Sequence, residues 1–384
     1  MSESFKVTSG TKQGCVLAPL LFSIYFTAML TVAFKDCIAG VTLRSRTDRN
    51  LFDLRKLQAK SKVTLSLIRD LLFADDCALA AHNLQEAQIL LDRFATASRR
   101  FGLSISLKKT EVMYQVRPNA AYSAPVLSMD GQNLPVADKF CYLGSIVSRD
   151  NSLASEISAR LAKAYSAFGR LSARLWSAHD IHLGVKIKVY TAAVLSSLLY
   201  GAESWTLYRG QLRKLETFHM SCLRHILRIS WRDRVSNVAL LRRCKVPSIE
   251  AMLLKAQLRW CGHVIRMPDS RIPKQLLYGQ LEYGTRNPGG QRKRYKDQLR
   301  CNLKACGIDK DHLELLVKDR TQWRSLCYSS INKFEADRCE ALDQKRSRRH
   351  QAASASYPTV FVCDVCQRDC HSRIGLFAHM RRHR

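Results

Sequence analysis

Two groups of side chains in this sequence have types and spacings that could do chemistry. The first is the adjacent pair Asp75 and Asp76, inside the apolar stretch LLFADDCALAA. Carboxylates removed from water need a cation nearby, and two adjacent ones also repel each other. At a tight turn between strands, the pair suits a divalent metal such as Mg²⁺, which phosphoryl transfer requires. The alternative is an ordinary hairpin turn whose acids face water.

The second group lies near the C-terminus. Residues 363–383 follow the spacing C-x2-C-x12-H-x3-H, which is typical of a C2H2 zinc finger. Cys363 and Cys366 suit a hairpin knuckle, and His379 and His383 share one face of a helix. A segment this small has almost no core, so a structural zinc ion would supply most of its folding free energy.

The finger is expected to hold nucleic acid through phosphate contacts. Its base-contacting helix positions are Ser372, Gly375 and Ala378, and none of these residues reads a base strongly. The side chains suited to phosphate contact are Arg373, Arg381, Arg382 and Arg384. Protein binding by the finger is the alternative.

Other cysteines and histidines form weaker groupings. They are His219, Cys222, His225, Cys261 and His263. A second zinc site is one interpretation, and ordinary core packing is the other, since buried cysteines and scattered histidines are common.

The acid pair requires strands that position it. Residues 69–74 and 77–81 read as short apolar strands, 83–101 as an amphipathic helix and 103–107 as an alternating strand. The capping and stop signals of this helix are Asn83, Glu86 and Gly102. A strand–turn–strand–helix–strand order predicts an α+β sheet layer.

The flanking segments extend this pattern. Residues 15–34 are apolar and predict a buried helix rather than a membrane span, because Pro19 and several hydroxyl residues interrupt them. The turn MDGQN predicts a hairpin within 117–138, and 140–148 reads as strand. From residue 153 to about 345 the pattern is mostly helical.

Composition points to a polyanionic partner. Lys and Arg number 62 against 32 Asp and Glu, a formal net charge of +30. RNA or DNA, held mainly through phosphates, is the expected partner, and the basic tract 286–300 could follow a nucleic-acid backbone. Fourteen cysteines without a secretory signal indicate reduced thiols in the nucleus or cytoplasm, with no secretion and no membrane.

Several motifs in this order resemble the reverse transcriptases of non-LTR (LINE-type) retrotransposons. They are QGCVLAP at 13–19, FADD at 73–76, GLSISLKKT at 102–110 and YLG at 142–144. The later stretches LLYGAESW and LRWCGHVIRM resemble the thumb and downstream region of such elements. The resemblance spans about 5–325.

The resemblance implies roles for single residues. Asp75, with Asp76 beside it, would bind catalytic magnesium, and Lys109 would act near the triphosphate. Gln13 and Gly14 would shape the template and nucleotide pocket. The residues that would hold the primer end are Tyr142, Leu143 and Gly144.

Two departures from the family pattern weaken the expected catalysis. Ser106 stands where the family usually has Asn. The first catalytic Asp of the family lies on a strand before the Gln-Gly motif, and Glu3, the acid before Gln13, lacks that context. We therefore expect this chain alone to polymerise poorly or not at all. A fingers region, or the full-length element protein, is an expected partner.

These inferences predict an α+β architecture with successive parts. They are a partial palm at 1–150, a helical thumb at 151–210, a basic helical region at 211–337, a charged linker at 338–357 and a C2H2 finger at 358–384. The expected function is that of a truncated RNA-directed DNA polymerase that binds nucleic acid, with zinc and magnesium as cofactors. The alternatives are a non-catalytic nucleic-acid-binding protein and a protein-interaction zinc finger.

Overall fold

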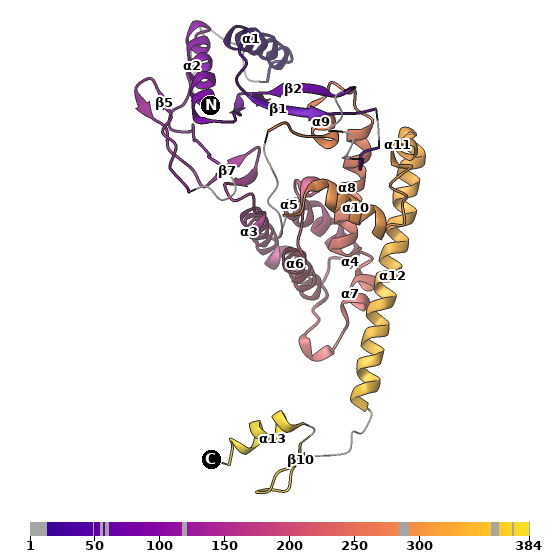
Figure 1. The fold of residues 1–384 in the computed structure, drawn as a ribbon. Coiled ribbons are helices and arrows are strands. Elements are labelled where there is room, and N and C mark those ends of the chain that lie inside the picture. Colours follow the sequence, from indigo (N-terminus) through magenta and orange to yellow (C-terminus); the bar gives the residue numbers. More distant parts are fainter. Residues whose placement is uncertain are drawn as a thin grey trace.

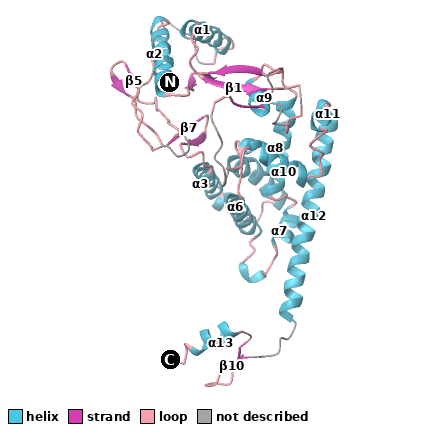
Figure 2. Cartoon of the chain, viewed as in Figure 1, coloured by secondary structure: helices cyan, strands magenta, loops and turns pink. Residues whose placement is uncertain are grey.

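The computed structural model describes residues 14–48, 50–53, 57, 61–116, 121–283, 292–354, 361–370 and 372–383. Short strands and two helices form the N-terminal part, and helices form the middle (Figure 1). Figure 2 shows the long helix that leads away from this middle, and the small strand-and-helix unit near the C-terminus. Helices with small antiparallel sheets are compatible with the expected α+β class.

The N-terminal part alternates helices with short hairpins. Its elements are α1 (Ala18–Ala33), β1 (Val41–Ser45), β2 (Thr64–Ile68), β3 (Asp70–Phe73), β4 (Asp76–Leu79), α2 (Leu84–Arg100), β5 (Ser128–Met129), β6 (Gln132–Asn133), β7 (Lys139–Tyr142) and β8 (Ser145–Ser148). The pairs β3–β4, β5–β6 and β7–β8 are antiparallel.

Helix α2 begins and ends where its sequence signals lie. The side chain of Asn83 accepts a hydrogen bond from the backbone N–H of Glu86, which caps the first turn. After the helix, Gly102 adopts a left-handed φ of 66°. The helix predicted at 83–101 is confirmed.

Helix α1 is less buried than the sequence predicts. Its buried residues are Phe26, Met29 and Ala33, which pack with α2 and neighbouring segments. The opposite side is exposed and apolar, with Leu20, Leu21, Ile24 and Tyr25. The prediction of a buried helix is therefore wrong for this side, because the packing elements cover a single stripe. No helix in the described part of the chain is long and apolar enough to cross a membrane.

Residues 103–107 alternate in burial but do not form a strand. Leu103, Ile105 and Leu107 are half-buried and pack in the clusters around α2. Within the described residues no strand pairs with this segment, so it lacks the ladder that defines a strand. The predicted strand is wrong, and the segment runs into a turn at 107–109.

A three-stranded sheet joins the N-terminal part to the helical middle. Its order is β2–β1–β9, and β9 (Gly279–Leu281) comes from far downstream. A Cβ at Gly279 would lie 2.5 Å from the carbonyl oxygen of Gln275 and 3.0 Å from that of Arg44. Only glycine allows this approach. The sequence patterns did not predict this long-range pairing.

The middle of the chain is helical, as expected. Its elements are α3 (Ala154–Arg170), η2 (Ser172–Trp176), α4 (Leu183–Val189), η3 (Tyr190–Leu195), α5 (Ser196–Leu198), η4 (Ala202–Ser204), α6 (Arg209–Leu227), η5 (Trp231–Asp233), α7 (Asn237–Cys244), α8 (Ile249–Ile265), α9 (Ile272–Tyr278), α10 (Tyr295–Ala305), α11 (Leu313–Lys318) and α12 (Arg320–Ser354). The chain then forms β10 (Phe361–Val362), β11 (Asp369–Cys370) and α13 (Arg373–Met380).

Two apolar clusters hold the helical middle together. One surrounds Trp176, Tyr190 and Phe218, and the other lies between α8 and α12. In the second cluster, a Cβ at Gly262 would overlap the indole of Trp323. Glycine at this position therefore permits the close packing of α12 on α8.

The segment 338–357, expected as a charged linker, is helical as far as Ser354. It continues α12, which starts at Arg320 and contains neither Gly nor Pro. Lys, Arg, Gln and Ala are good helix formers, so the high charge of this segment does not prevent it from forming a helix. The basic side chains of this segment consequently have defined faces.

Candidate functional site

Asp75 and Asp76 lie at the tip of the β3–β4 hairpin. Phe73 pairs with Asp76, which leaves Ala74 and Asp75 as the turn. Ala74 has a φ of 52°, a left-handed conformation that costs a non-glycine residue about 1 kcal/mol. Both carboxylates are exposed. The hairpin around the acids has the predicted form, and its metal-binding role stays a prediction.

Asp75 and Asp76 offer two adjacent carboxylates that could hold one magnesium ion. Within the described residues, Asp75 and Asp76 are not part of a group of three or more close His, Cys, Asp or Glu side chains. Mg²⁺ is commonly held by one or two carboxylates together with water and substrate phosphates. A two-metal centre needs further carboxylates beside this pair.

The β7–β8 hairpin carries the residues expected to hold a primer end. Tyr142 pairs with Ser145, so Leu143 and Gly144 form the turn. Their φ angles are 50° and 78°. Two positive φ angles are typical of a type I′ turn, which glycine adopts readily and leucine does not.

Tyr142 connects this hairpin to the acid hairpin. Its hydroxyl donates a hydrogen bond of 2.9 Å to the carbonyl oxygen of Leu71 in β3. Burial raises the pKa of Tyr142, and the nearby Cys77 and Asp76 raise it further. Two motifs that are separate in the sequence thus lie together in the fold.

A buried ion pair on α3 contacts the same turn. Arg160 and Glu156 are 2.7 Å apart, and their side chains are 5% and 3% exposed. Arg160 donates a hydrogen bond of 2.5 Å to the carbonyl oxygen of Gly144. Glu156 accepts one of 2.6 Å from the backbone N–H of Ile146. Sequence reasoning missed this pair, although charges four residues apart on an amphipathic helix were a visible signal.

Tyr200 contacts the turn from a third segment. Its hydroxyl donates a hydrogen bond of 3.0 Å to the carbonyl oxygen of Leu143. The guanidinium of Arg160 lies 4.5 Å from the centre of the Tyr200 ring. The stretch LLYGAESW, which the sequence assigned to the thumb, therefore meets the YLG turn.

Gly14 and Lys109 are predicted polymerase-site residues that lie within the described part of the chain. Gly14 lies in an exposed turn before α1, with a φ of 89°, and Gln13 lies outside the described residues. Lys109 is exposed in the turn at 107–109, where its backbone N–H donates to the carbonyl oxygen of Ser106. Their proposed nucleotide contacts stay predictions.

The four predicted zinc ligands are brought together. One ligand atom from each of Cys363, Cys366, His379 and His383 lies within 4.8 Å of the others. The Sγ of Cys366 is 3.0 Å from the Nε2 of His379, which is 3.1 Å from the Nε2 of His383. This set could hold a metal ion, and two thiolates with two imidazoles suit zinc.

The protonation states of the cluster also suit a metal. The pKa of Cys363 is lowered, first because the backbone N–H of Cys366 donates to its sulfur. Burial, followed by the neighbouring His383, lowers the pKa of His379. Metals bind thiolate and neutral imidazole, which are the forms that both shifts favour.

Two members of the weaker cysteine and histidine grouping on α6 are core, and His225 of the same grouping is exposed. His219 and Cys222 are buried, and an imidazole nitrogen of His219 lies 2.8 Å from the hydroxyl of Tyr190. Burial lowers the pKa of His219 to about 4. Within the described residues, the side chains close enough to hold a metal together are the four C-terminal ligands. His219 and Cys222 are not among them.

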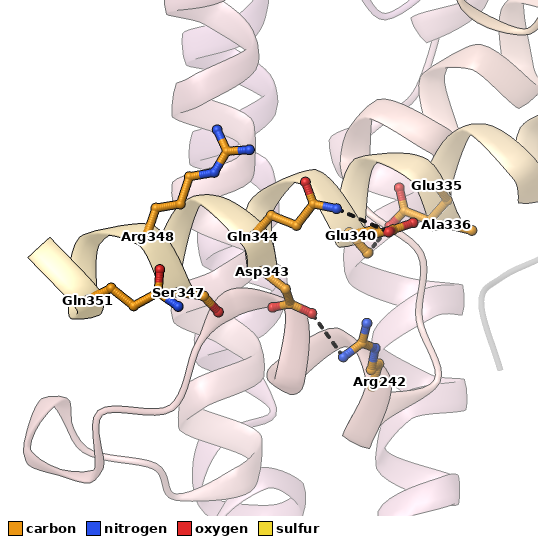
Figure 3. Close-up of a pocket in the computed structure, with 10 residues that line it drawn as sticks. Arg242, Glu335, Ala336, Glu340, Asp343, Gln344, Ser347, Arg348 and Gln351 are labelled. Carbon is orange, nitrogen blue, oxygen red and sulfur yellow. Dashed lines mark hydrogen bonds and ion pairs between the residues drawn. The ribbon is translucent and has the colours of Figure 1, made fainter.

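An open groove runs beside α12 (Figure 3). Arg242 of α7 reaches across it to Asp343 of α12, at 3.1 Å. Glu335 and Glu340 also line it, together with Arg348. Because charges of both signs share this groove, it does not favour a phosphate.

Another face of α12 carries mostly basic side chains. It carries Leu342, Lys345, Arg346, Arg349 and His350, which line a second open groove and are exposed. The guanidinium of Arg346 donates a hydrogen bond of 2.8 Å to the carbonyl oxygen of Arg234. This bond brings a third exposed arginine, Arg234, beside the face. We call Lys345, Arg346, Arg349 and His350 the basic face of α12.

Two comparisons found known proteins that are similar in sequence to parts of this chain. Residues 1–147 match the sequence profile of the family described as reverse transcriptase (RNA-dependent DNA polymerase). The range contains the acid hairpin and the Leu143–Gly144 turn. A transposon-derived protein of Caenorhabditis elegans is 26% identical over 267 residues, covering 67% of this chain and 94% of that protein. The N-terminal part of the chain is therefore similar in sequence to a reverse-transcriptase domain.

Proposed function

We propose that this chain is a nucleic-acid-binding protein derived from the reverse transcriptase of a LINE-type retrotransposon. The observation that carries the proposal is the hydrogen bond from Tyr142 to Leu71 within the matched domain. It holds the YLG turn beside the acid pair, where the end of a primer strand would lie next to a catalytic metal. The transposon-derived relative supports the same origin.

The residues of the domain take the following roles in this proposal. Asp75 and Asp76 bind Mg²⁺, which when bound would neutralise phosphate charge. The turn of Leu143 and Gly144, with Tyr142, contacts the primer end. Lys109 offers an ammonium to the triphosphate. The template and nucleotide pocket is shaped by Gln13 and Gly14.

We infer that this chain alone has little or no polymerase activity. Asp75 and Asp76 are adjacent and exposed, and within the described residues no third acid joins them as a candidate metal ligand. In two-metal phosphoryl transfer, the two ions stabilise the attacking and the leaving oxygen. Two adjacent carboxylates alone are a poor ligand set for two ions. A carboxylate supplied by another polypeptide segment would complete the centre.

The C-terminal unit acts as a C2H2 zinc finger in this proposal. Two short strands and one helix surround the four ligands, and Cys370 is buried beside them. Cys370 fills a core position and is not a fifth ligand. Ser372, Gly375 and Ala378 offer no strong base contact, so the finger grips phosphate through its arginines.

The basic face of α12 contributes phosphate contacts next to the finger. From residue 344 to Ser354 the helix contains no acidic residue. The formal net charge of +30 supports a polyanionic partner. A helix carries its charges at spacings that a flexible linker would not maintain, which favours contact with a regular phosphate backbone.

The basic face can be tested by salt dependence. The triple variant Lys345→Gln, Arg346→Gln, Arg349→Gln should bind duplex DNA more weakly than the unchanged protein. Loss of phosphate contacts should also reduce the slope of log Kd against log salt by about 2 to 3. Fluorescence anisotropy between low and moderate salt measures both quantities.

A matched control uses the other end of the same helix. Arg320→Gln, Arg324→Gln, Lys333→Gln removes the same charge from exposed positions of α12. This control should leave the salt slope nearly unchanged. Equal slopes for the two triple variants would count against a role of the basic face, and a flat salt dependence of the unchanged protein would count against nucleic-acid binding.

A second candidate function is protein binding by the finger. Ile374 and Phe377 lie three residues apart on α13, and their side chains are 82% and 59% exposed. Exposed apolar side chains on a helix of this size favour a protein contact over a phosphate contact. If Ile374→Ser and Phe377→Ser leave nucleic-acid affinity unchanged but abolish a protein complex, this function gains support.

A further inference from the structure

We propose that Glu156, Arg160 and Tyr200 are positioning residues that hold the Leu143–Gly144 turn against the Asp75–Asp76 hairpin. Through this turn they determine how firmly the protein grips the 3′ end of a strand. The inference rests on the proposed function, because it takes the turn to be the primer contact. It adds a group of residues outside the range 1–147 that matches the reverse-transcriptase family.

The turn requires external support because its conformation is unfavourable. Leu143 has a φ of 50° and Gly144 a φ of 78°. Type I′ turns favour Asn, Asp or Gly at both central positions, so leucine at the first is strained. Strained backbone persists when the surrounding structure restrains it.

The three residues supply that restraint through backbone groups. Tyr200 donates to the carbonyl oxygen of Leu143 at 3.0 Å, and Arg160 donates to that of Gly144 at 2.5 Å. Glu156 accepts from the N–H of Ile146 at 2.6 Å. Side chains from α3 and from the segment after α5 thus bind both carbonyls of the turn and an amide in β8.

The restraining side chains are themselves held in place. Glu156 and Arg160 are almost fully buried and paired at 2.7 Å. The Tyr200 ring lies against the Arg160 guanidinium, at 4.5 Å from its centre. A buried ion pair is often no more stabilising than apolar side chains of the same size. The geometry here points to a positional role for the pair.

The restraint on the turn also reaches the hairpin that carries the acid pair. The turn itself remains exposed to solvent. Tyr142, directly before the turn, donates to the carbonyl oxygen of Leu71 in β3. A shift of the turn would therefore displace the hairpin that carries Asp76. The side chain of Leu143 is 37% exposed and Gly144 is exposed, so a nucleic-acid strand can reach both.

The test removes one hydroxyl. Tyr200→Phe deletes the hydrogen bond to Leu143 and keeps the ring against Arg160. The matched control is Tyr165→Phe on α3, whose ring is 56% exposed and lies edge-on to Phe218. The full chain is titrated with a primer–template bearing a recessed 3′ end and with a blunt duplex of the same length, and Tm is measured for each variant.

We expect the unchanged protein to prefer the recessed end. Tyr200→Phe should weaken binding to the recessed end about fivefold, the equivalent of one hydrogen bond. The affinity of Tyr200→Phe for the blunt duplex and its Tm should change little. A merely structural role would instead lower Tm and weaken binding to both duplexes. Tyr165→Phe should behave like the unchanged protein. If Tyr200→Phe and the unchanged protein bind the recessed-end duplex with the same affinity, the proposal is overturned.

A second measurement separates this proposal from the proposed function. If the unchanged protein does not distinguish the two duplexes, the primer contact is refuted. Amide hydrogen exchange of residues 140–148 then tests the restraint alone. Faster exchange in Tyr200→Phe than in Tyr165→Phe supports the positioning role, and equal exchange overturns it.

Discussion

Replacing Cys366 by alanine should remove zinc from the protein and unfold residues 361–383. Cys366 is one of four ligands whose donor atoms lie within 4.8 Å of one another. Structural zinc supplies about 10 kcal/mol or more to finger peptides, and so small a unit has little core to replace it. Metal analysis should show a loss of one zinc per chain, and limited proteolysis should remove the C-terminal unit first.

Cys370→Ala is the matched control for the finger. Cys370 is also buried in the unit, but it is not among the four clustered ligands. This variant should keep its zinc and resist proteolysis nearly as well as the unchanged protein. Full zinc content in Cys366→Ala, or zinc loss in Cys370→Ala, would contradict the ligand assignment.

Glu156→Ala should lower the free energy of unfolding by about 3 to 5 kcal/mol. The change leaves the Arg160 guanidinium buried without its partner, at a side-chain exposure of 5%. It also leaves the N–H of Ile146 without its acceptor. Urea denaturation followed by tryptophan fluorescence measures the effect, because Trp176 is buried in the cluster that includes α3 residues.

Arg99→Ala is the control for this ion pair. Asp130 pairs with Arg99 at 2.6 Å, but both side chains are about half exposed or more, at 49% and 62%. Exposed pairs contribute about 0 to 1 kcal/mol, so this variant should be nearly as stable as the unchanged protein. A Glu156→Ala effect no larger than that of Arg99→Ala would show that the buried pair is not structurally important.

Local signals predicted the elements that local chemistry determines. The acid hairpin, the capped helix α2 and the four-ligand cluster each depend on residues close in sequence. Asn83 and Gly102 delimit α2 by hydrogen bonding and backbone conformation, which need no distant partner. These features could be read from the sequence before the fold was known.

Features that depend on distant partners could not be predicted in this way. Residues 103–107 alternate correctly, yet a strand also needs a neighbour with which to pair. The exposed side of α1 depends on which elements pack against it. Strand β9 joins β1 through a close approach at Gly279, for which the sequence pattern gives no register.

The candidate site shows the same division. The acid pair and the YLG motif were recognised separately, but the hydrogen bond from Tyr142 to Leu71 follows from tertiary packing. The Glu156–Arg160 pair has the i, i+4 spacing of an ordinary pair on a helix surface, and its burial depends on tertiary packing. Charge composition alone likewise suggested a linker at 338–357, where α12 instead orders its basic side chains on a face.

Primer extension, measured together with binding, tests whether this chain binds nucleic acid without polymerising it. The purified chain is mixed with a labelled primer–template, nucleotides and Mg²⁺, and complex and product are quantified in the same samples. We expect the primer–template to be bound and no extended primer to accumulate. Magnesium-dependent extension by this chain, abolished by Asp75→Asn, would contradict it.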